Sequence, residues 1–259
     1  MKSIILAAFA MIVPASLLQA QDIRTITTPV EKHLYATKGR QFDFSPKAIE
    51  DFNNREARYL EIKKKYEAGE ATQEQLETME YEAFCRENIY DIFGAECNFY
   101  CGCNYDTVIA SSALEPQGNR SYEAWNAADL SYETAWVEGR IGYGIGEWIE
   151  YQFPANNPRI TTMIFCNGYV RTQKAWEENG RVKKMMVTIN GKEFTTLHFD
   201  DVYAEQYFDV GKIGWDHNKG ANPSTEPIKI RFTILDVYPG TKYEDTAITE
   251  IYFDGIDVH

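Results

Sequence analysis

The sequence predicts a mainly β protein, in which a β-sandwich follows a small helical hairpin with a cysteine cluster. From about residue 105 onward, short β-prone runs are separated by Gly, Asn, Pro and Asp, with no helical pattern between them. Before that point, two stretches combine helix start signals with helical spacing of apolar residues. We therefore expect a leader at 1–20, a helical, cysteine-containing segment at 21–104 and the sandwich at 105–259.

The composition is that of a globular protein, with 44% hydrophobic and 25% charged residues among 259. A formal net charge of −13 argues against simple electrostatic binding to nucleic acid or to an anionic membrane. After the opening segment, no apolar run approaches the roughly 20 residues that a membrane-spanning helix needs. We expect no nucleic acid partner, and no transmembrane segment once the leader is removed.

Residues 1–20 have the features of a secretory signal peptide. Lys2 supplies a positive charge, residues 4–18 are apolar, and the small Ala20 precedes the polar Gln21. The alternative is an N-terminal membrane anchor, for which this apolar stretch is short. We predict cleavage after Ala20 and a secreted or periplasmic protein.

Four clustered cysteines follow the predicted helices, and export would place them in an oxidising compartment. They allow three disulfide pairings, among which the sequence does not choose. The alternative is a zinc site, although the spacing lacks the usual two CxxC pairs. We favour two disulfides, and we expect Cys166, in an apolar run, to be a buried free thiol. The disulfide candidates are Cys85, Cys97, Cys101 and Cys103.

The helical and β segments have separate signals. Residues 21–44 are expected to form an extended lead-in. Ser45 and Pro46 begin the first helix, which Gly69 ends, and Thr72 with Gln75 forms a capping box for the second. Asn190-Gly191 is a strong hairpin turn signal. The expected strands span 148–153, 160–165, 182–189, 193–199, 228–237 and 247–253.

Several motif blocks in the sandwich region occur in an order that is more specific than any single block. They are ADLSYETAWVEG (128–139), GIGEWI (144–149), NGY (167–169), NGRVKK (179–184) and DVYPGTKYEDTAITEI (236–251). In this order they resemble the discoidin, or coagulation factor V/VIII type C, family with its galactose-binding-like jelly roll. The most similar branch is the glycan-binding domain found beside secreted bacterial NAD glycohydrolases, where it assists toxin translocation. The resemblance covers roughly residues 105–258.

The resemblance implies binding without catalysis, and it implies a structural calcium ion beside the strand ends. An early Asp-x-x-x-x-Thr loop and a late Glu supply oxygens in sugar-binding members, and Asp129, Thr134 and Glu250 occupy the matching positions. Calcium prefers six to eight oxygen ligands, which suits these side chains together with loop carbonyls. Leu130 stands where that loop usually carries glycine. The alternative is that Asp129 and Glu250 only cap loops.

Sugar recognition needs flat apolar faces and hydrogen-bonding groups, and residues of both kinds occur in the predicted loops. The candidate faces are Trp136, Tyr143, Tyr169, Trp176 and Tyr238. The candidate polar contacts are Glu138, Asn167, Asn179, Arg181 and Asp245. For any one of these aromatic residues, the competing interpretation is a place in the sandwich core.

The sequence gives little support for an enzyme. The four histidines form no HExxH motif, and no GxSxG elbow is present. We therefore predict a secreted, non-catalytic glycan-binding protein. The alternative is an extracytoplasmic scaffold that binds a protein partner through the N-terminal helices and the sandwich loops.

Overall fold

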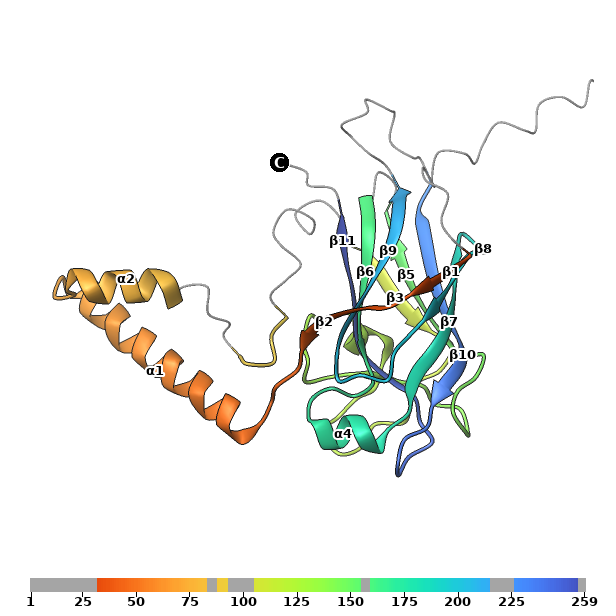
Figure 1. Ribbon diagram of the computed structural model, residues 1–259, viewed down its shortest axis with the longest axis horizontal. Helices are drawn as coiled ribbons and strands as arrows, with labels where there is room; N and C mark the ends of the chain where they lie inside the picture. Colours follow the sequence, from red (N-terminus) through yellow and green to blue (C-terminus); the bar gives the residue numbers. More distant parts are fainter. Residues whose placement is uncertain (1–31, 83–87, 93–104, 155–158, 215–225, 256–259) are drawn as a thin grey trace, which may run out of the picture.

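The computed structural model describes residues 32–82, 88–92, 105–154, 159–214 and 226–255. The predicted signal peptide and the four clustered cysteines lie outside the described residues. The described part of the chain is a two-sheet sandwich with a helical hairpin that projects away from it (Figure 1). None of the described helices combines the length and hydrophobicity required to span a lipid bilayer.

The hairpin consists of α1 (Pro46–Glu67) and α2 (Gln73–Glu82), and both predicted helix starts are confirmed. The Ser45 hydroxyl accepts a hydrogen bond from the Ala48 backbone N–H at 3.2 Å. Thr72 and Gln75 form the reciprocal capping box, with N···O distances of 3.0 and 3.3 Å. Gly69, at φ +73°, follows the end of α1 and has a left-handed backbone that glycine adopts readily.

The two sheets have a mainly antiparallel topology, and among the strand pairs of the described residues only β1 and β8 run in parallel. The six-stranded sheet contains, in order, β1 (His33–Tyr35), β8 (Lys192–His198), β7 (Arg181–Ile189), β10 (Ile228–Tyr238), β5 (Trp148–Phe153) and β3 (Thr107–Ala110). The five-stranded sheet contains, in order, β2 (Thr37–Gln41), β9 (Ala204–Gly214), β6 (Arg159–Asn167), β11 (Ala247–Gly255) and β4 (Trp136–Val137). Two short helices, η1 (Ala124–Ala127) and α4 (Gln173–Glu178), lie in the connections. The predicted jelly-roll sandwich is confirmed.

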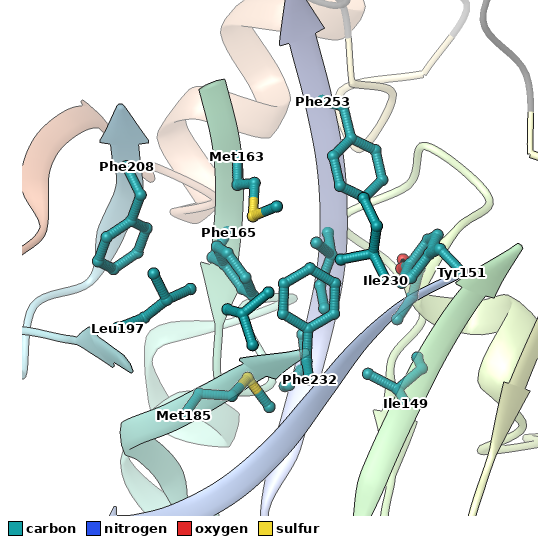
Figure 2. Packing of buried hydrophobic residues seen from close by; sticks show 14 of the residues in the cluster. Ile149, Tyr151, Met163, Phe165, Met185, Leu197, Phe208, Ile230, Phe232 and Phe253 are labelled. Carbon is teal, nitrogen blue, oxygen red and sulfur yellow. Dashed lines mark hydrogen bonds between the residues drawn. The ribbon is translucent and has the colours of Figure 1, made fainter. Parts of the chain in front are cut away.

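The main core fills the space between the sheets with aromatic and branched side chains. Figure 2 shows Phe165 of β6 and Phe253 of β11 pointing toward Phe232 of β10 and Tyr151 of β5. The rings of Phe165 and Phe232 meet edge to face at 5.4 Å. Every predicted strand is present, because alternating apolar residues along each one reach this core.

The first two strands correct the predicted boundary at residue 105. β1 pairs with β8 and forms an edge of one sheet, and β2 pairs with β9 and forms an edge of the other. The extended lead-in therefore passes from one sheet to the other and belongs to the sandwich. Sequence analysis also missed β9, whose glycines and polar residues obscure the alternation that places Phe208 and Val210 in the core.

A second apolar cluster covers the outer face of the five-stranded sheet. Phe42 packs edge to face on Tyr132 at 5.4 Å and on Tyr203 at 5.2 Å. Beneath them, the buried Glu205 carboxylate accepts hydrogen bonds from Tyr132 at 2.6 Å and from Arg40 at 2.9 Å. The N-terminal segment thus supplies both an apolar cover and the counter-charge that Glu205 needs when buried.

Phe232→Ala is expected to lower the free energy of unfolding by about 3–5 kcal/mol, because it removes a fully buried ring and leaves a cavity between the sheets. Urea denaturation measures the change. Leu235→Ala on the same strand is the control, since Leu235 is 40% exposed; its effect should stay within about 0.5 kcal/mol. Equal losses in the two variants would contradict the assignment of the core.

Candidate functional site

The loop of residues 129–134 brings the predicted calcium ligands together. The Thr134 hydroxyl donates to Asp129 Oδ2 at 2.6 Å, and the Ser131 N–H donates to Asp129 Oδ1 at 3.1 Å. The Leu130 N–H donates to Glu250 Oε2 on β11 at 2.7 Å. Leu130 has φ +56°, a left-handed conformation that explains why the resembling loops usually carry glycine there. A leucine at this position therefore still forms the tight loop.

Glu250 is the unusual group at this loop. Its side chain is fully buried, and Oε1 has no hydrogen-bond partner. Burial and the neighbouring charge of Asp129 raise the pKa of Glu250 well above its usual range. Removal of water from around the Asp129 carboxylate also raises the pKa of Asp129. A bound cation would compensate both charges.

The donor set suits a hard cation. Across the described ranges, no three His, Cys, Asp or Glu side chains gather closely enough to hold a metal ion by themselves. A cation at the 129–134 loop would therefore also need hydroxyl and carbonyl oxygens, which are ligands that calcium accepts and zinc rarely uses. The unpaired Glu250 Oε1, with Asp129 and Thr134 nearby, fits calcium.

The segment 88–92 holds the 129–134 loop from outside. The Ile92 N–H donates to the Leu130 carbonyl at 2.8 Å, and the Tyr132 N–H donates to the Tyr90 carbonyl at 2.7 Å. Sequence analysis assigned no role to this segment. Its contacts fix the loop conformation over Glu250.

Two of the predicted sugar contacts are buried parts of the framework. Trp136 is fully buried in the core, and its indole N–H donates to the Ser112 carbonyl at 2.9 Å. The Asn167 side chain bonds both backbone groups of Val182, at 2.8 and 2.9 Å. The prediction that Trp136 offers a face to a sugar is wrong, because its ring packs in the interior of the sandwich. Asn167 likewise has its amide groups committed to joining β6 and β7.

Glu138 and Arg181 also hold loops together. Glu138 is buried, and its carboxylate accepts from the Arg140 N–H at 2.8 Å and the Thr246 N–H at 3.2 Å. Arg181 is buried and forms a two-pronged ion pair with Asp201 at 2.9 and 3.0 Å. Neither charge faces a free surface, so the prediction that they contact a sugar directly is not supported by their positions.

The predicted residues with intermediate exposure are Tyr143, Trp176, Asn179, Tyr238 and Asp245. Trp176 carries the Arg181 guanidinium over its ring at 4.6 Å, and its indole N–H donates to the Asn167 carbonyl at 2.9 Å. Tyr238 donates to the Phe199 carbonyl at 3.0 Å. Asn179 donates to the Ala175 carbonyl at 2.8 Å. The polar groups of Trp176, Tyr238 and Asn179 therefore form hydrogen bonds within the fold.

Tyr169 and Asp245 belong to a cluster that we call the Tyr243 surface, which consists of Arg120, Tyr122, Tyr169, Tyr243 and Asp245. Tyr122 and Tyr169 are buried beneath it, and Asp245 is half-buried. Tyr122 has the other four as its electrostatic neighbours, and burial raises its pKa. Tyr243 is 41% exposed, and Arg120 is also exposed. Sequence analysis predicted only Tyr169 and Asp245 here. Tyr243, in the polar turn after Pro239-Gly240, was the available signal for the exposed ring.

Backbone hydrogen bonds to α4 position Tyr243. The Tyr243 N–H donates to the Glu178 carbonyl at 2.9 Å, and the Thr241 N–H donates to the Glu177 carbonyl at 2.9 Å. At Gly240, a Cβ atom would lie only 2.4 Å from the Glu178 carbonyl oxygen, so this close approach requires glycine. The Lys242 ammonium lies 4.5 Å from the Tyr243 ring centroid. The turn is fixed while the Tyr243 side chain remains accessible.

The fold and both clusters correspond to a known family. The model of the NAD glycohydrolase translocation F5/8 type C domain matches residues 99–254. The chain belongs to this family. The match includes the 129–134 loop, Glu250 and the Tyr243 surface, so both clusters lie within the family domain. A comparison with curated proteins finds no significant match.

Three solved structures of bacterial domains resemble this chain at low sequence identity. The CBM32-1 and CBM32-2 domains of Clostridium perfringens ZmpB, in complex with GalNAc, align over 88% of this chain and 40% of theirs, at 10% identity and TM-score 0.44. This chain therefore spans about two fifths of that structure. CBM32-3 of a C. perfringens family 31 glycoside hydrolase aligns over 57% of this chain and 91% of its own length, at 15% identity and TM-score 0.40. The C-terminal domain of a Bacteroides fragilis chitobiase aligns over 60% of this chain and 95% of its own length, at 15% identity and TM-score 0.36.

The buried Glu250 predicts a distinctive pH dependence in the presence of a chelator. Because its pKa is higher in the folded protein than in the unfolded chain, its contribution to stability is present below about pH 4 and is lost as the pH rises toward the raised value. Relative to Glu250→Gln, the wild-type chain should therefore be more stable at pH 4 than at pH 7. Urea denaturation at both pH values measures this difference.

Glu115→Gln is the control for that comparison, because Glu115 is exposed. It should change stability equally at the two pH values. A wild-type advantage over Glu250→Gln that grows from pH 4 to pH 7 would show that the carboxylate is stabilised in its charged form without a cation.

Proposed function

We propose that this sandwich is a non-catalytic carbohydrate-binding module of an exported protein and that it binds a glycan at the Tyr243 surface. The observation that carries the proposal is the exposed Tyr243 ring, fixed by its backbone two residues before Asp245. Arg120, Tyr243 and Asp245 all interact electrostatically with the buried Tyr122. An aromatic face packs against the C–H side of a sugar ring, while a carboxylate and a guanidinium hydrogen-bond its hydroxyls.

The character of this surface suggests modest affinity. One exposed ring and two charged groups make a small contact area, so we expect dissociation constants from micromolar to millimolar, or roughly −8 to −4 kcal/mol. Preorganisation of the Tyr243 turn by backbone hydrogen bonds limits the entropy that is lost on binding. A glycan with repeated units would gain avidity if several copies of the module bound it together.

The residues of the Tyr243 surface favour binding over catalysis. Glycoside hydrolysis generally uses a pair of carboxylates, whereas these five residues include one, that of Asp245. They contain no histidine, serine or cysteine to act as a nucleophile with a base. A binding role requires only the exposed ring and its polar neighbours.

Export is supported by the sequence of residues 1–20 and by the cysteine cluster. The apolar stretch and Ala20 suit signal peptide cleavage, and clustered cysteines suit an oxidising compartment. Membership of a family described by NAD glycohydrolase translocation is consistent with a role outside the cytoplasm.

We further propose that the 129–134 loop holds a structural calcium ion with Glu250, Asp129 and Thr134. The unpaired, buried Glu250 Oε1 supports this, because a charged oxygen in the interior is costly without a counter-ion. Calcium would supply positive charge between two carboxylates. Tyr169 connects the two sites, since its hydroxyl donates to the Glu133 carbonyl at 3.3 Å within the same loop.

The helical hairpin favours a second role, as a scaffold that binds a protein partner. It projects from the sandwich (Figure 1), and α1 carries Leu60 and Tyr66 with about half of each side chain exposed. Deleting residues 21–104 would not test this role cleanly, because it would remove β1 and β2 from the sandwich. Leu60→Lys combined with Tyr66→Lys separates the two roles: it should abolish capture of a protein partner and leave glycan binding unchanged.

Tyr243→Ala is expected to weaken glycan binding at least about tenfold, because it removes the apolar face on which the sugar packs. A glycan array of the exported chain, with and without calcium, identifies the ligand, and isothermal titration then compares the variants. Tyr35→Ala is the matched control, since Tyr35 is 71% exposed but lies on β1. The affinity of the Tyr35→Ala variant for the glycan should equal that of the wild type.

A folded Tyr243→Ala protein that retains full affinity would refute the assignment of the surface. An array without any signal from folded wild-type protein would refute glycan binding itself and would favour the scaffold role.

Calcium at about one hundred times its dissociation constant should raise the free energy of unfolding by about 2.7 kcal/mol, which corresponds to roughly 5–10 °C in melting temperature. Glu250→Gln should abolish the increase because it removes a charged ligand, whereas Glu115→Gln should preserve it. Differential scanning calorimetry with calcium or chelator measures both. An equal calcium response in Glu250→Gln would place the ion elsewhere.

A further inference from the structure

Two histidines face each other at the edge of the six-stranded sheet. β1 runs parallel to β8, and this pairing brings His33 Nδ1 to 3.1 Å from His198 Nε2. The centroids of the two rings are 5.2 Å apart. The residues are 165 positions apart in the chain, so their proximity depends on β1 joining this sheet.

The surroundings orient the pair without enclosing it. Tyr35 stacks on the His198 ring with a centroid distance of 4.6 Å and an interplanar angle of 20°, which restricts rotation of that ring. His33 is exposed to solvent. Backbone hydrogen bonds before and after His33 along β1 hold the two strands in register. The Thr196 N–H donates to the Lys32 carbonyl at 3.0 Å, and the Ala36 N–H donates to the His198 carbonyl at 2.9 Å.

We propose that His33 and His198 bind a divalent transition-metal ion, such as Zn²⁺ or Cu²⁺, with water completing its coordination. Imidazole nitrogen is a preferred ligand of both ions. Two nitrogens bound to one tetrahedral zinc ion at about 2.0–2.1 Å lie about 3.3 Å apart, close to the distance found here. In the metal-free pair, one of these nitrogens donates a hydrogen bond to the other. Metal binding therefore requires the tautomers in which both nitrogens lack a proton, together with rotation of the exposed His33 ring so that both lone pairs face one ion. This site is separate from the Tyr243 surface and goes beyond the proposed glycan binding.

Nearby charges both oppose and favour metal binding at this pair. Lys184 of β7 lies directly opposite His198, and its positive charge opposes a bound cation. Burial and the charges of His33 and Lys184 also lower the pKa of His198, which keeps its ring neutral and able to donate a lone pair. Lys184 therefore makes the site weaker than two histidines alone and offers a position at which affinity can be increased.

Metal binding would have a structural consequence. An ion shared by His33 and His198 would connect β1 to β8, and β1 is only three residues long and lies at the edge of its sheet. The bridge would therefore slow opening of the segment that carries the chain from one sheet to the other. It would act on a short strand that backbone hydrogen bonds hold at one side only.

The test uses residues 21–259 without a polyhistidine tag. Isothermal titration with Zn²⁺ and electron paramagnetic resonance with Cu²⁺ should reveal one site, whose copper spectrum shows coupling to two imidazole nitrogens. His33→Gln and His198→Gln should each lower affinity by about tenfold or more and remove that coupling. Zn²⁺ should also slow backbone hydrogen exchange at residues 33–36 in the wild type only.

Lys184→Glu should tighten binding at least severalfold, because it removes a repulsive charge and adds a carboxylate beside His198. Lys174→Glu on α4 makes the same charge change away from the pair and should leave affinity unchanged. Unchanged metal affinity in both histidine variants, with folded proteins by circular dichroism, would overturn the proposal. So would equal tightening by Lys184→Glu and Lys174→Glu, because it would show that the site is elsewhere and responds only to net charge.

Discussion

The buried carboxylate of Glu250 constrains much of the structure around it. A charge in the interior must be compensated by hydrogen bonds or a counter-ion, and Glu250 receives one backbone hydrogen bond from Leu130. Leu130 has a left-handed backbone, and its bond to Glu250 ties the 129–134 loop to β11. The same loop places Tyr132 in the second apolar cluster and offers the Glu133 carbonyl to Tyr169. The loop, the cover of the five-stranded sheet and one side of the Tyr243 surface therefore all depend on how this one carboxylate is satisfied.

The fold was largely predictable because most strands bury one face. Alternation from Trp148 to Phe153, and the Asn190-Gly191 turn, were sufficient to predict β5 and the hairpin of β7 and β8. The N-terminal strands were not predictable in the same way, because β1 and β2 are short and lie at sheet edges. Their place is determined by long-range contacts, such as that of Arg40 with Glu205, which local patterns do not encode. The sandwich therefore extends to residues that the sequence assigned to a separate segment.

The candidate sites were predictable to different degrees. Asp129 and Thr134 are joined by a hydrogen bond in the predicted loop, and Glu250 accepts from the Leu130 N–H of the same loop. Their assignment as calcium ligands stays a prediction. Half of the predicted sugar contacts are buried in the framework, whereas the others stay predictions. Trp136 and Arg181 have the residue types that glycan sites use, but the same types hold loops in place through buried hydrogen bonds and ion pairs. Residue type alone does not distinguish the two roles, because both need aromatic rings and multiple donors; burial and hydrogen-bond partners do distinguish them.

The distinction between these roles follows from how each loop is anchored. Around Arg181, side chains make the connections: its guanidinium bonds Asp201 and two backbone carbonyls, so four of its five N–H donors are used within the fold. The turn at 240–243 is anchored by backbone groups on α4 and by the close approach of Gly240. The Thr241 hydroxyl also donates to the Glu177 carbonyl at 3.0 Å. The turn is therefore held by its backbone and by Thr241, and Tyr243 faces solvent in a fixed position. A surface can recognise a ligand only with groups that the fold does not already use, and by this criterion the Tyr243 turn is the best candidate among the described loops.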